Sequence, residues 1–307
     1  MNDYVLSVLL GIVEGLTEFL PVSSTAHLRI AEALLHIDLG DAYWKMYTVV
    51  IQLGAILALL LLFSSRIIEF IRTFPRGENG DRTVWNHPIS LTMIAFVVTA
   101  IPSWLLAKVI GKHLESLHIM AMSLLIGGIV MWVVDAWSVR RTALTADIER
   151  MSLSQAVWVG FCQIFSAVFP GTSRSMSTIA GGQIVGMTRS AALEFSFLVS
   201  IPTMIAATGY EALRTLHPSH AHAAASAHAA KALAGSPFPA ESLAPLVMNG
   251  HRWIVLVIGL VVSFFVALAV VEWFLMWVRR HGFVLFAVYR IVLGLLLLAF
   301  GAKLAAG

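Results

Sequence analysis

Two carboxylates, two serines and a histidine lie within fourteen residues near the start of the chain, with apolar sequence on both sides. The segment 14–27 reads EGLTEFLPVSSTAH, and a second segment, 170–175, reads PGTSRS and adds an arginine. Charged side chains at membrane depth are costly, so where they occur they usually face a cavity and mark function. Carboxylate, hydroxyl, imidazole and guanidinium groups together favour phosphate chemistry at a lipid boundary.

Glu14 and Glu18 are four residues apart, which places both carboxylates on one face of a helix. Such a pair can bind a hard divalent cation through oxygen. It can also divide roles, with one carboxylate ionised and the other acting as an acid–base group. The alternative is a pair that faces water at the outer rim, which the apolar neighbours disfavour. We therefore expect Glu14 and Glu18 to be catalytic residues and metal ligands.

The sequence PVSST at 21–25 breaks the first helix. Ser23, Ser24 or Thr25 can cap the next helix, whose free N–H groups form a ready anion site. His27 follows Ser24 by about one helical turn, where an imidazole can act as general base, general acid or nucleophile. Capping explains one hydroxyl but not three hydroxyls followed by a histidine. We expect Ser24 and His27 to be catalytic and Ser23 and Thr25 to bind substrate.

The second polar segment is suited to holding phosphate. A glycine lets the backbone approach a ligand closely, and an arginine offers a fixed-charge fork that matches phosphate oxygens. The alternative is that Arg174 forms a structural ion pair with Glu14 or Glu18, which an empty site can also hold. We expect Arg174 to be catalytic and four neighbours to bind substrate: Gly171, Thr172, Ser173 and Ser175.

Two further places carry polar groups within apolar sequence. Gln52 precedes Gly54, which permits close helix approach, so Gln52 either contacts substrate or hydrogen-bonds between helices. We retain it as a substrate-binding candidate. Glu194 and Ser196 are ambiguous in the same way.

The composition indicates a membrane-embedded chain. Of 307 residues, 59% are hydrophobic and 12% are charged, whereas roughly 25% charged is typical of soluble domains. The formal net charge of +3 is modest and does not favour nucleic-acid binding. Cys162 is the single cysteine, which excludes an intrachain disulfide. The N-terminus lacks the basic region of a signal peptide, so we expect it to be retained.

Six apolar runs are each about long enough to cross a hydrocarbon core of roughly 30 Å. They lie at 43–63, 90–110, 118–138, 190–213, 252–277 and 283–304. Segments 4–35 and 155–187 differ, because a Pro/Gly/Ser/Thr break divides each into two short apolar runs. Broken backbone at membrane depth is tolerated only inside protein or along a cavity. We therefore predict two re-entrant helix–loop–helix hairpins.

The two hairpins resemble each other in sequence. At an offset of 149 residues, Gly11 aligns with Gly160, Glu14 with Gln163, Pro21 with Pro170 and Ser24 with Ser173. Three predicted spans follow each hairpin, which gives the halves opposite orientations. The predicted fold is an all-α polytopic membrane protein with one domain, 1–307. It comprises an inverted repeat of 1–138 and 152–307 with the site near the midplane.

Basic residues predict the orientation of the chain. In this topology three arginine-bearing loops share one face, which is therefore cytoplasmic, and the site opens to the outer face. The residues are Arg66, Arg72, Arg76 and Arg82, then Arg140, Arg141 and Arg150, then Arg279 and Arg280. Segment 217–245, rich in Ala, His and Pro, is expected to be a poorly ordered outer loop; metal capture is the alternative.

Three motifs resemble the undecaprenyl-diphosphate phosphatase family of bacterial inner membranes, which is linked to bacitracin resistance. They are EGLTEFLPVSSTAHL at 14–28, PGTSRS at 170–175 and FSFLVSIPT at 195–203. The resemblance runs through most of the chain, apart from the His-rich segment. It implies removal of the terminal phosphate from undecaprenyl diphosphate at the outer face, with Mg²⁺ or Ca²⁺. It assigns the family's motifs to Glu14 and Glu18, to Ser24 and His27, and to Ser173 and Arg174.

The residue chemistry agrees with that activity, since a diphosphate needs charge neutralisation and an in-line nucleophile. Our first choice is Ser24 as nucleophile with His27 as its base; direct attack by His27, or a water that it activates, stays open. The spans 43–63 and 190–213 are expected to border a groove for the polyprenyl chain. A lipid-phosphate flippase or ion-coupled transporter is the alternative, and a serine with a base favours the enzyme. The sequence leaves a homo-oligomer open.

Overall fold

The computed structural model describes residues 2–38, 41–77, 80, 82–106, 116–216 and 248–304. The predicted outer loop 217–245 lies outside these residues. The described part is helical, apart from one isolated β-bridge between Thr145 and Met187. The helices are α1 (Asp3–Thr17), α2 (Ser24–Leu34), α3 (Ala42–Val50), α4 (Gln52–Leu62), α5 (Ser64–Thr73), α6 (Pro88–Leu105), α8 (Leu117–Ser138), η1 (Ile148–Arg150), α9 (Leu153–Val168), α10 (Arg174–Ile184), α11 (Arg189–Leu216), α13 (Gly250–His281) and α14 (Val284–Leu304).

The prediction of six candidate membrane spans is confirmed by length and composition. They are α3 with α4 (Ala42–Leu62), α6, α8, α11, α13 and α14. The first span is interrupted at Ile51, where the N–H of Gly54 donates to the Ile51 carbonyl in a three-residue turn. Such tightened turns inside helices often accompany functional sites. The break leaves Gln52 as the first residue of α4.

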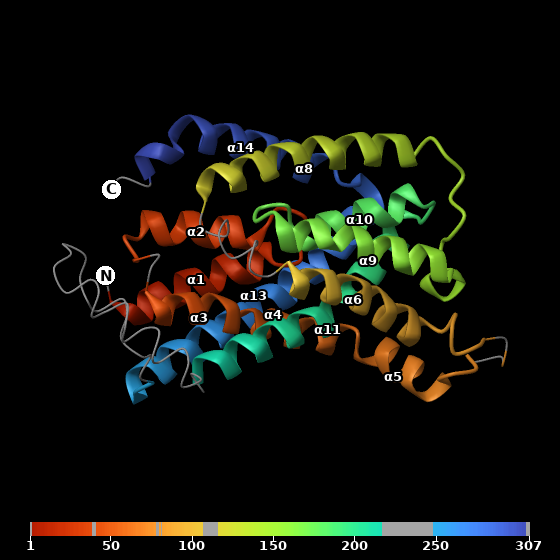
Figure 1. The fold of residues 1–307 in the computed structure, drawn as a ribbon, viewed down its shortest axis with the longest axis horizontal. Coiled ribbons are helices and arrows are strands. Elements are labelled where there is room, and N and C mark those ends of the chain that lie inside the picture. Colours follow the sequence, from red (N-terminus) through yellow and green to blue (C-terminus); the bar gives the residue numbers. More distant parts are fainter. Residues whose placement is uncertain are drawn as a thin grey trace.

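Two helix–loop–helix pairs, α1–α2 and α9–α10, approach each other from opposite ends of the bundle, and their turns lie side by side near its middle (Figure 1). Asn2 caps α1, and Ser152 caps α9 in a capping box with Gln155. With 15 and 16 residues, these helices are about 23 Å long. Each is therefore too short to cross a core of roughly 30 Å.

The first helices of the two pairs bury equivalent faces. Glycine allows the closest approach in both: a Cβ at Gly11 would meet the Gly259 carbonyl of α13, and one at Gly160 would meet the Ala95 carbonyl of α6. Five of the six buried residues of α1, all except Gly15, correspond to the buried residues of α9 at an offset of 149, as 160 − 11 = 149. They are Leu6, Ser7, Leu10, Gly11 and Glu14 in α1, and Gln155, Ala156, Val159, Gly160 and Gln163 in α9.

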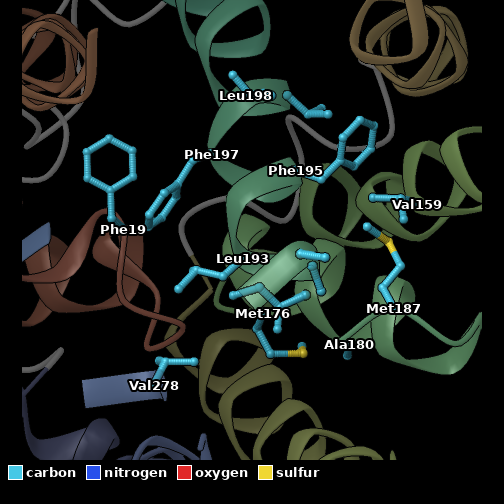
Figure 2. Close-up of a cluster of buried hydrophobic side chains, with 14 of the residues drawn as sticks. Phe19, Val159, Met176, Ala180, Met187, Leu193, Phe195, Phe197, Leu198 and Val278 are labelled. Atoms are coloured by element: carbon cyan, nitrogen blue, oxygen red, sulfur yellow. The ribbon is translucent and has the colours of Figure 1, made fainter. Parts of the chain in front are cut away.

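The turn after α1 is anchored in the main hydrophobic core. Phe19 is 0% exposed and packs edge-to-face on Phe197 of α11, with ring centroids 5.4 Å apart (Figure 2). Phe197 also contacts Phe63 and Phe274. Burying one such side chain contributes about 1.5–3 kcal/mol. The core therefore fixes the backbone next to Glu18.

The two ambiguous residues of α11 have structural partners. Glu194 accepts a hydrogen bond from Arg66 Nε at 3.2 Å, and Arg66 also pairs with Glu149 at 2.6 Å. Ser196 Oγ lies 2.6 Å from Thr178 Oγ of α10. Arg279 lines a pocket with Arg66 and Glu194, so parts of the three basic loops meet at one end of the molecule.

Candidate active site

The turns of the two pairs have the same frame. Ser23 caps α2 and Ser173 caps α10, and each Oγ accepts the N–H of the residue three positions later. Both serines have positive φ, 75° and 71°, a conformation that costs a non-glycine residue of order 1–3 kcal/mol. Such a conformation persists only where the surrounding structure maintains it, and residues strained in this way cluster at functional sites.

The sequence alignment of Ser24 with Ser173 is corrected by these caps, since the counterpart of Ser173 is Ser23. The offset is 149 along α1 and α9 but 150 at the caps, as 173 − 23 = 150. The second turn has one more residue, with PGTS in 170–173 where the first has PVS in 21–23. Gly171 provides the turn with a φ of 91°. The first residues of the two helices, Ser24 and Arg174, therefore occupy matching positions.

A cavity of about 200 Å³ lies between the two turns and two spans. Eight predicted site residues line it: Glu18, Ser23, Ser24, Thr25, Gln52, Gly171, Ser173 and Arg174. Of these, Thr25 is exposed. Five lining residues were not predicted from the sequence: Ser166, Pro170, Thr203, Met204 and Ala207. The last three share one face of α11, and a polar threonine after Pro202 inside an apolar span was an available signal.

Glu18 connects the two turns. Its Oε1 accepts a hydrogen bond from Arg174 Nη2 at 2.9 Å, and its Oε2 accepts one from Ser24 Oγ at 2.5 Å. Both partners of the ion pair are largely buried, and charge-assisted hydrogen bonds are the strong ones in such surroundings. A carboxylate in contact with a serine hydroxyl can receive its proton. Glu18 thus holds the position beside Ser24 that the sequence interpretation gave to His27.

His27 lies away from Ser24. Its Nδ1 is 2.7 Å from the Ser23 carbonyl oxygen, which can only accept, so that nitrogen carries the proton and donates. Its Nε2 is 2.7 Å from the hydroxyl of Tyr289 in α14, and the two rings stack. The structure does not bring His27 and Ser24 together, because the imidazole turns back to the backbone of the cap.

Glu14 is 0% exposed, and neither carboxylate oxygen has a hydrogen-bond partner within the described residues. Glu18 and Arg174 are near enough to act on its charge. Buried carboxylates are normally paired or bind metal. The described residues hold no group of three or more His, Cys, Asp and Glu side chains suited to a metal. Two carboxylates with nearby hydroxyls fit Mg²⁺, which commonly takes one or two carboxylates and completes its shell with substrate phosphates and water.

Two predicted substrate-binding residues do not line the cavity. Ser175 Oγ donates to the Leu20 carbonyl at 3.0 Å and so ties the second turn to the first. The Thr172 carbonyl accepts from Arg290 Nη2 at 2.9 Å. Arg290, fully buried in α14, and its neighbour Tyr289 were missed from the sequence. A lone arginine inside an apolar span is the signal that marks such a residue.

Comparison with known proteins identifies the family of the chain. The family model described as bacitracin resistance protein BacA matches residues 7–296. The undecaprenyl-diphosphatase of Koribacter versatilis (strain Ellin345) is 59% identical over 304 residues, 99% of this chain and 100% of that protein. Proteins of the same name from Rhizobium etli (strain CIAT 652) and Aquifex aeolicus (strain VF5) are 39% and 36% identical, across 96% of this chain and 96% and 97% of theirs. The resemblance seen in the motifs is thereby confirmed, and the chain belongs to the BacA family of undecaprenyl-diphosphatases.

Proposed function

We propose that this protein hydrolyses undecaprenyl diphosphate to undecaprenyl phosphate and inorganic phosphate, the activity for which its relatives are named. The observation that carries the proposal is the contact of Glu18 with both Ser24 and Arg174 at one cavity. A nucleophile, a proton acceptor and a phosphate-binding cation are thus held together. Hydrolysis recycles the lipid carrier for cell-wall synthesis, and abundant recycling accounts for bacitracin resistance.

The proposed reaction begins when the diphosphate displaces Glu18 as the partner of Arg174. Ser24 Oγ attacks the terminal phosphorus and gives its proton to Glu18, while the bond to the bridging oxygen breaks and undecaprenyl phosphate leaves. Water then releases phosphate from the serine. Both steps depend on in-line positioning of the attacking oxygen and on stabilisation of the phosphoryl charge. Attack by water with Glu18 as base is the variant, and direct attack by His27 is disfavoured by its contacts.

We propose Glu14 and Glu18 as the ligands of a divalent cation, Mg²⁺ or Ca²⁺. The unpartnered oxygens of buried Glu14 support this assignment. When bound, the cation would neutralise charge on the diphosphate oxygens. Arg174 contributes a guanidinium fork, and the first N–H groups of α2 and α10 add donors for phosphate oxygens.

We further propose that α1–α2 and α9–α10 are re-entrant hairpins and that the single domain is an inverted repeat of 1–138 and 152–307. Their short first helices and their approach from opposite ends support this arrangement (Figure 1). The basic loops then face the cytoplasm of a bacterial inner membrane, and the cavity opens outward. The polyprenyl chain would pass between α4 and α11, which contribute Gln52, Met204 and Ala207 to the cavity.

The test is phosphate release by the purified protein from a polyprenyl diphosphate, with and without a chelator. We expect release by the wild type, loss with chelator, and a loss of at least about 10³-fold in kcat for Ser24→Ala. Arg280→Met, at an exposed residue outside the cavity lining, is the control. Absence of release under any divalent cation, combined with transfer of the lipid between leaflets, would support a flippase instead.

A further inference from the structure

Arg290 is the largest fully buried side chain in the described part of the chain, and it lies in the apolar helix α14. No carboxylate within the described residues pairs with it. Its terminal nitrogens donate instead to four backbone carbonyls, those of Pro21, Ser123, Gly171 and Thr172. A buried charge without a carboxylate is expensive. An arginine at such a position is useful when its several N–H groups bind more acceptors at once than a neutral side chain could.

Three of these four bonds link the two turns of the candidate site, and the fourth, to Ser123, reaches α8. Nη1 donates to the Pro21 carbonyl at 3.1 Å, and Nη2 donates to Gly171 and Thr172 at 3.1 and 2.9 Å. Pro21 is three residues before Ser24, and Thr172 is two residues before Arg174. One guanidinium therefore holds the backbone directly before both side chains that meet Glu18.

Arg290 also sets the direction of a peptide group. The C=O and N–H of one trans peptide point in opposite directions. The bond to the Thr172 carbonyl therefore directs the Ser173 N–H away from the guanidinium. Ser173 lines the cavity, so this orientation favours an N–H available to a phosphate oxygen.

Gly127 of α8 makes room for this guanidinium. A Cβ added at Gly127 would collide with Arg290 Nη2 and would lie 2.8 Å from Met176 Cε. Neither contact is with backbone, so an alanine at this position displaces the arginine head and leaves the charge present. The chain thus offers a variant that moves Arg290 without removing it.

We propose that Arg290 is a positioning residue that fixes the separation and orientation of the two turns, so that Ser24 and Arg174 face the same diphosphate. It does not line the cavity, so it acts through the backbone of residues that do. This inference rests on the proposed phosphatase activity for its kinetic consequence. Its structural consequence, restraint of both turns, is independent of that activity.

The experiment compares Arg290→Met, Arg290→Lys, Gly127→Ala and the exposed control Arg280→Met in detergent-purified full-length protein. Steady-state phosphate release gives kcat and KM, and hydrogen exchange gives the protection of peptides covering 18–23 and 169–173. Misplacement by about 1 Å can cost 10²-fold. We expect kcat to fall about 100-fold for Arg290→Met and about 10-fold for Arg290→Lys and Gly127→Ala. KM should change less than about 5-fold in each variant, because Arg290 is outside the cavity lining.

Exchange should accelerate in both turns of Arg290→Met and remain unchanged in Arg280→Met. Normal kcat and unchanged exchange in Arg290→Met would overturn the proposal. Acceleration spread through all helices, with kcat and KM altered together, would also overturn it by indicating a general packing role. If Arg290→Met does not fold, Arg290→Lys and Gly127→Ala decide by the same two readouts. If the wild type releases no phosphate, the proposed function fails, and the exchange result alone decides the role of Arg290.

Discussion

The turn before α2 and the turn before α10 share a backbone frame but carry different side chains. Each follows a short helix packed through a glycine, and each ends in a serine cap with positive φ. The first residue of the helix that follows is Ser24 in one and Arg174 in the other, and both bind Glu18. One backbone conformation, used twice, can therefore place an attacking group on one side of the cavity and a phosphate-binding group on the other.

The two pairs also differ at the buried polar residue of the first helix, which is Glu14 in α1 and Gln163 in α9. Glu14 has no partner for either oxygen, whereas Gln163 donates through Nε2 to Thr203 Oγ1 at 3.1 Å. A carboxylate left without a donor is open to a cation. The amide is instead tied to the span that lines the cavity. Negative charge is therefore concentrated in the first pair, and the second pair has a neutral amide at the position of Glu14.

The largest expected effect comes from removing the group that both turns share. Glu18→Gln keeps the shape but loses the negative charge that accepts from Ser24 and Arg174. General base catalysis contributes about 10²–10⁴-fold, so kcat for phosphate release should fall about 10³-fold. Gln163→Ala, at the buried polar residue of the second pair, is the comparison, because Gln163 does not contact Ser24 or Arg174. A loss of kcat as large as that of Glu18→Gln would contradict the proposed difference between the two pairs.

Alanine substitutions at the phenylalanines of the two turns, Phe19 and Phe169, should differ in their effect on the free energy of unfolding. Phe19 is 0% exposed, and Phe169, which directly precedes Pro170 in the second turn, is 47% exposed. Phe19→Ala should lower the free energy of unfolding by about 3–5 kcal/mol, as for other buried aromatics. Phe169→Ala should change it by less than about 1 kcal/mol, within the small range of exposed sites. Denaturant titration in detergent measures both, and equal effects would contradict the described burial.

The Mg²⁺ dependence of phosphate release should distinguish the role of Glu14 from that of Gln163. Glu14→Gln makes the two helices alike at this position and removes one proposed carboxylate ligand. The Mg²⁺ concentration for half-maximal phosphate release should rise about 10-fold or more. Direct binding by titration calorimetry checks the same shift without turnover. An unchanged Mg²⁺ requirement would remove Glu14 from the cation site.

The smallest effect is expected at His27. Its two hydrogen bonds, to the Ser23 carbonyl and Tyr289, hold the first turn. Since a hydrogen bond contributes about 0.5–1.5 kcal/mol, His27→Ala should reduce kcat roughly 10-fold, and Tyr289→Phe should do so less. If His27→Ala abolished turnover as Ser24→Ala does, the pairing inferred from sequence spacing would be restored.

The spans were predictable because long apolar runs leave little choice at membrane depth. The polar segments were predictable because charged side chains such as Glu14, Glu18 and Arg174 are costly within apolar sequence and therefore usually mark a functional site. Spacing alone did not fix contacts. His27 lies one turn after Ser24, yet side chains on a helix point back toward its N-terminus, and this one meets the Ser23 carbonyl.

Three features required three-dimensional context. The extra residue in the second turn shifted the correspondence of the caps by one. The interruption at Ile51 lies within one candidate span, Ala42–Leu62, whose mean hydropathy is high, so hydropathy did not indicate it. Arg290 is conspicuous as a charged residue in the last span, but the partners that define its role are carbonyls 118 to 269 residues away. Backbone acceptors have no sequence signature, so its role could not be read from residue types.

The two serine-capped helix starts have a consequence for the release of product. Each helix contributes roughly half a positive elementary charge at its N-terminus, and α2 and α10 both begin at the cavity. With the guanidinium of Arg174 they create a field that favours the most highly charged ligand. In the proposed reaction, cleavage leaves a lipid with one phosphate in place of two. The spent carrier is therefore held less strongly than the incoming one, and the same field that captures substrate promotes turnover.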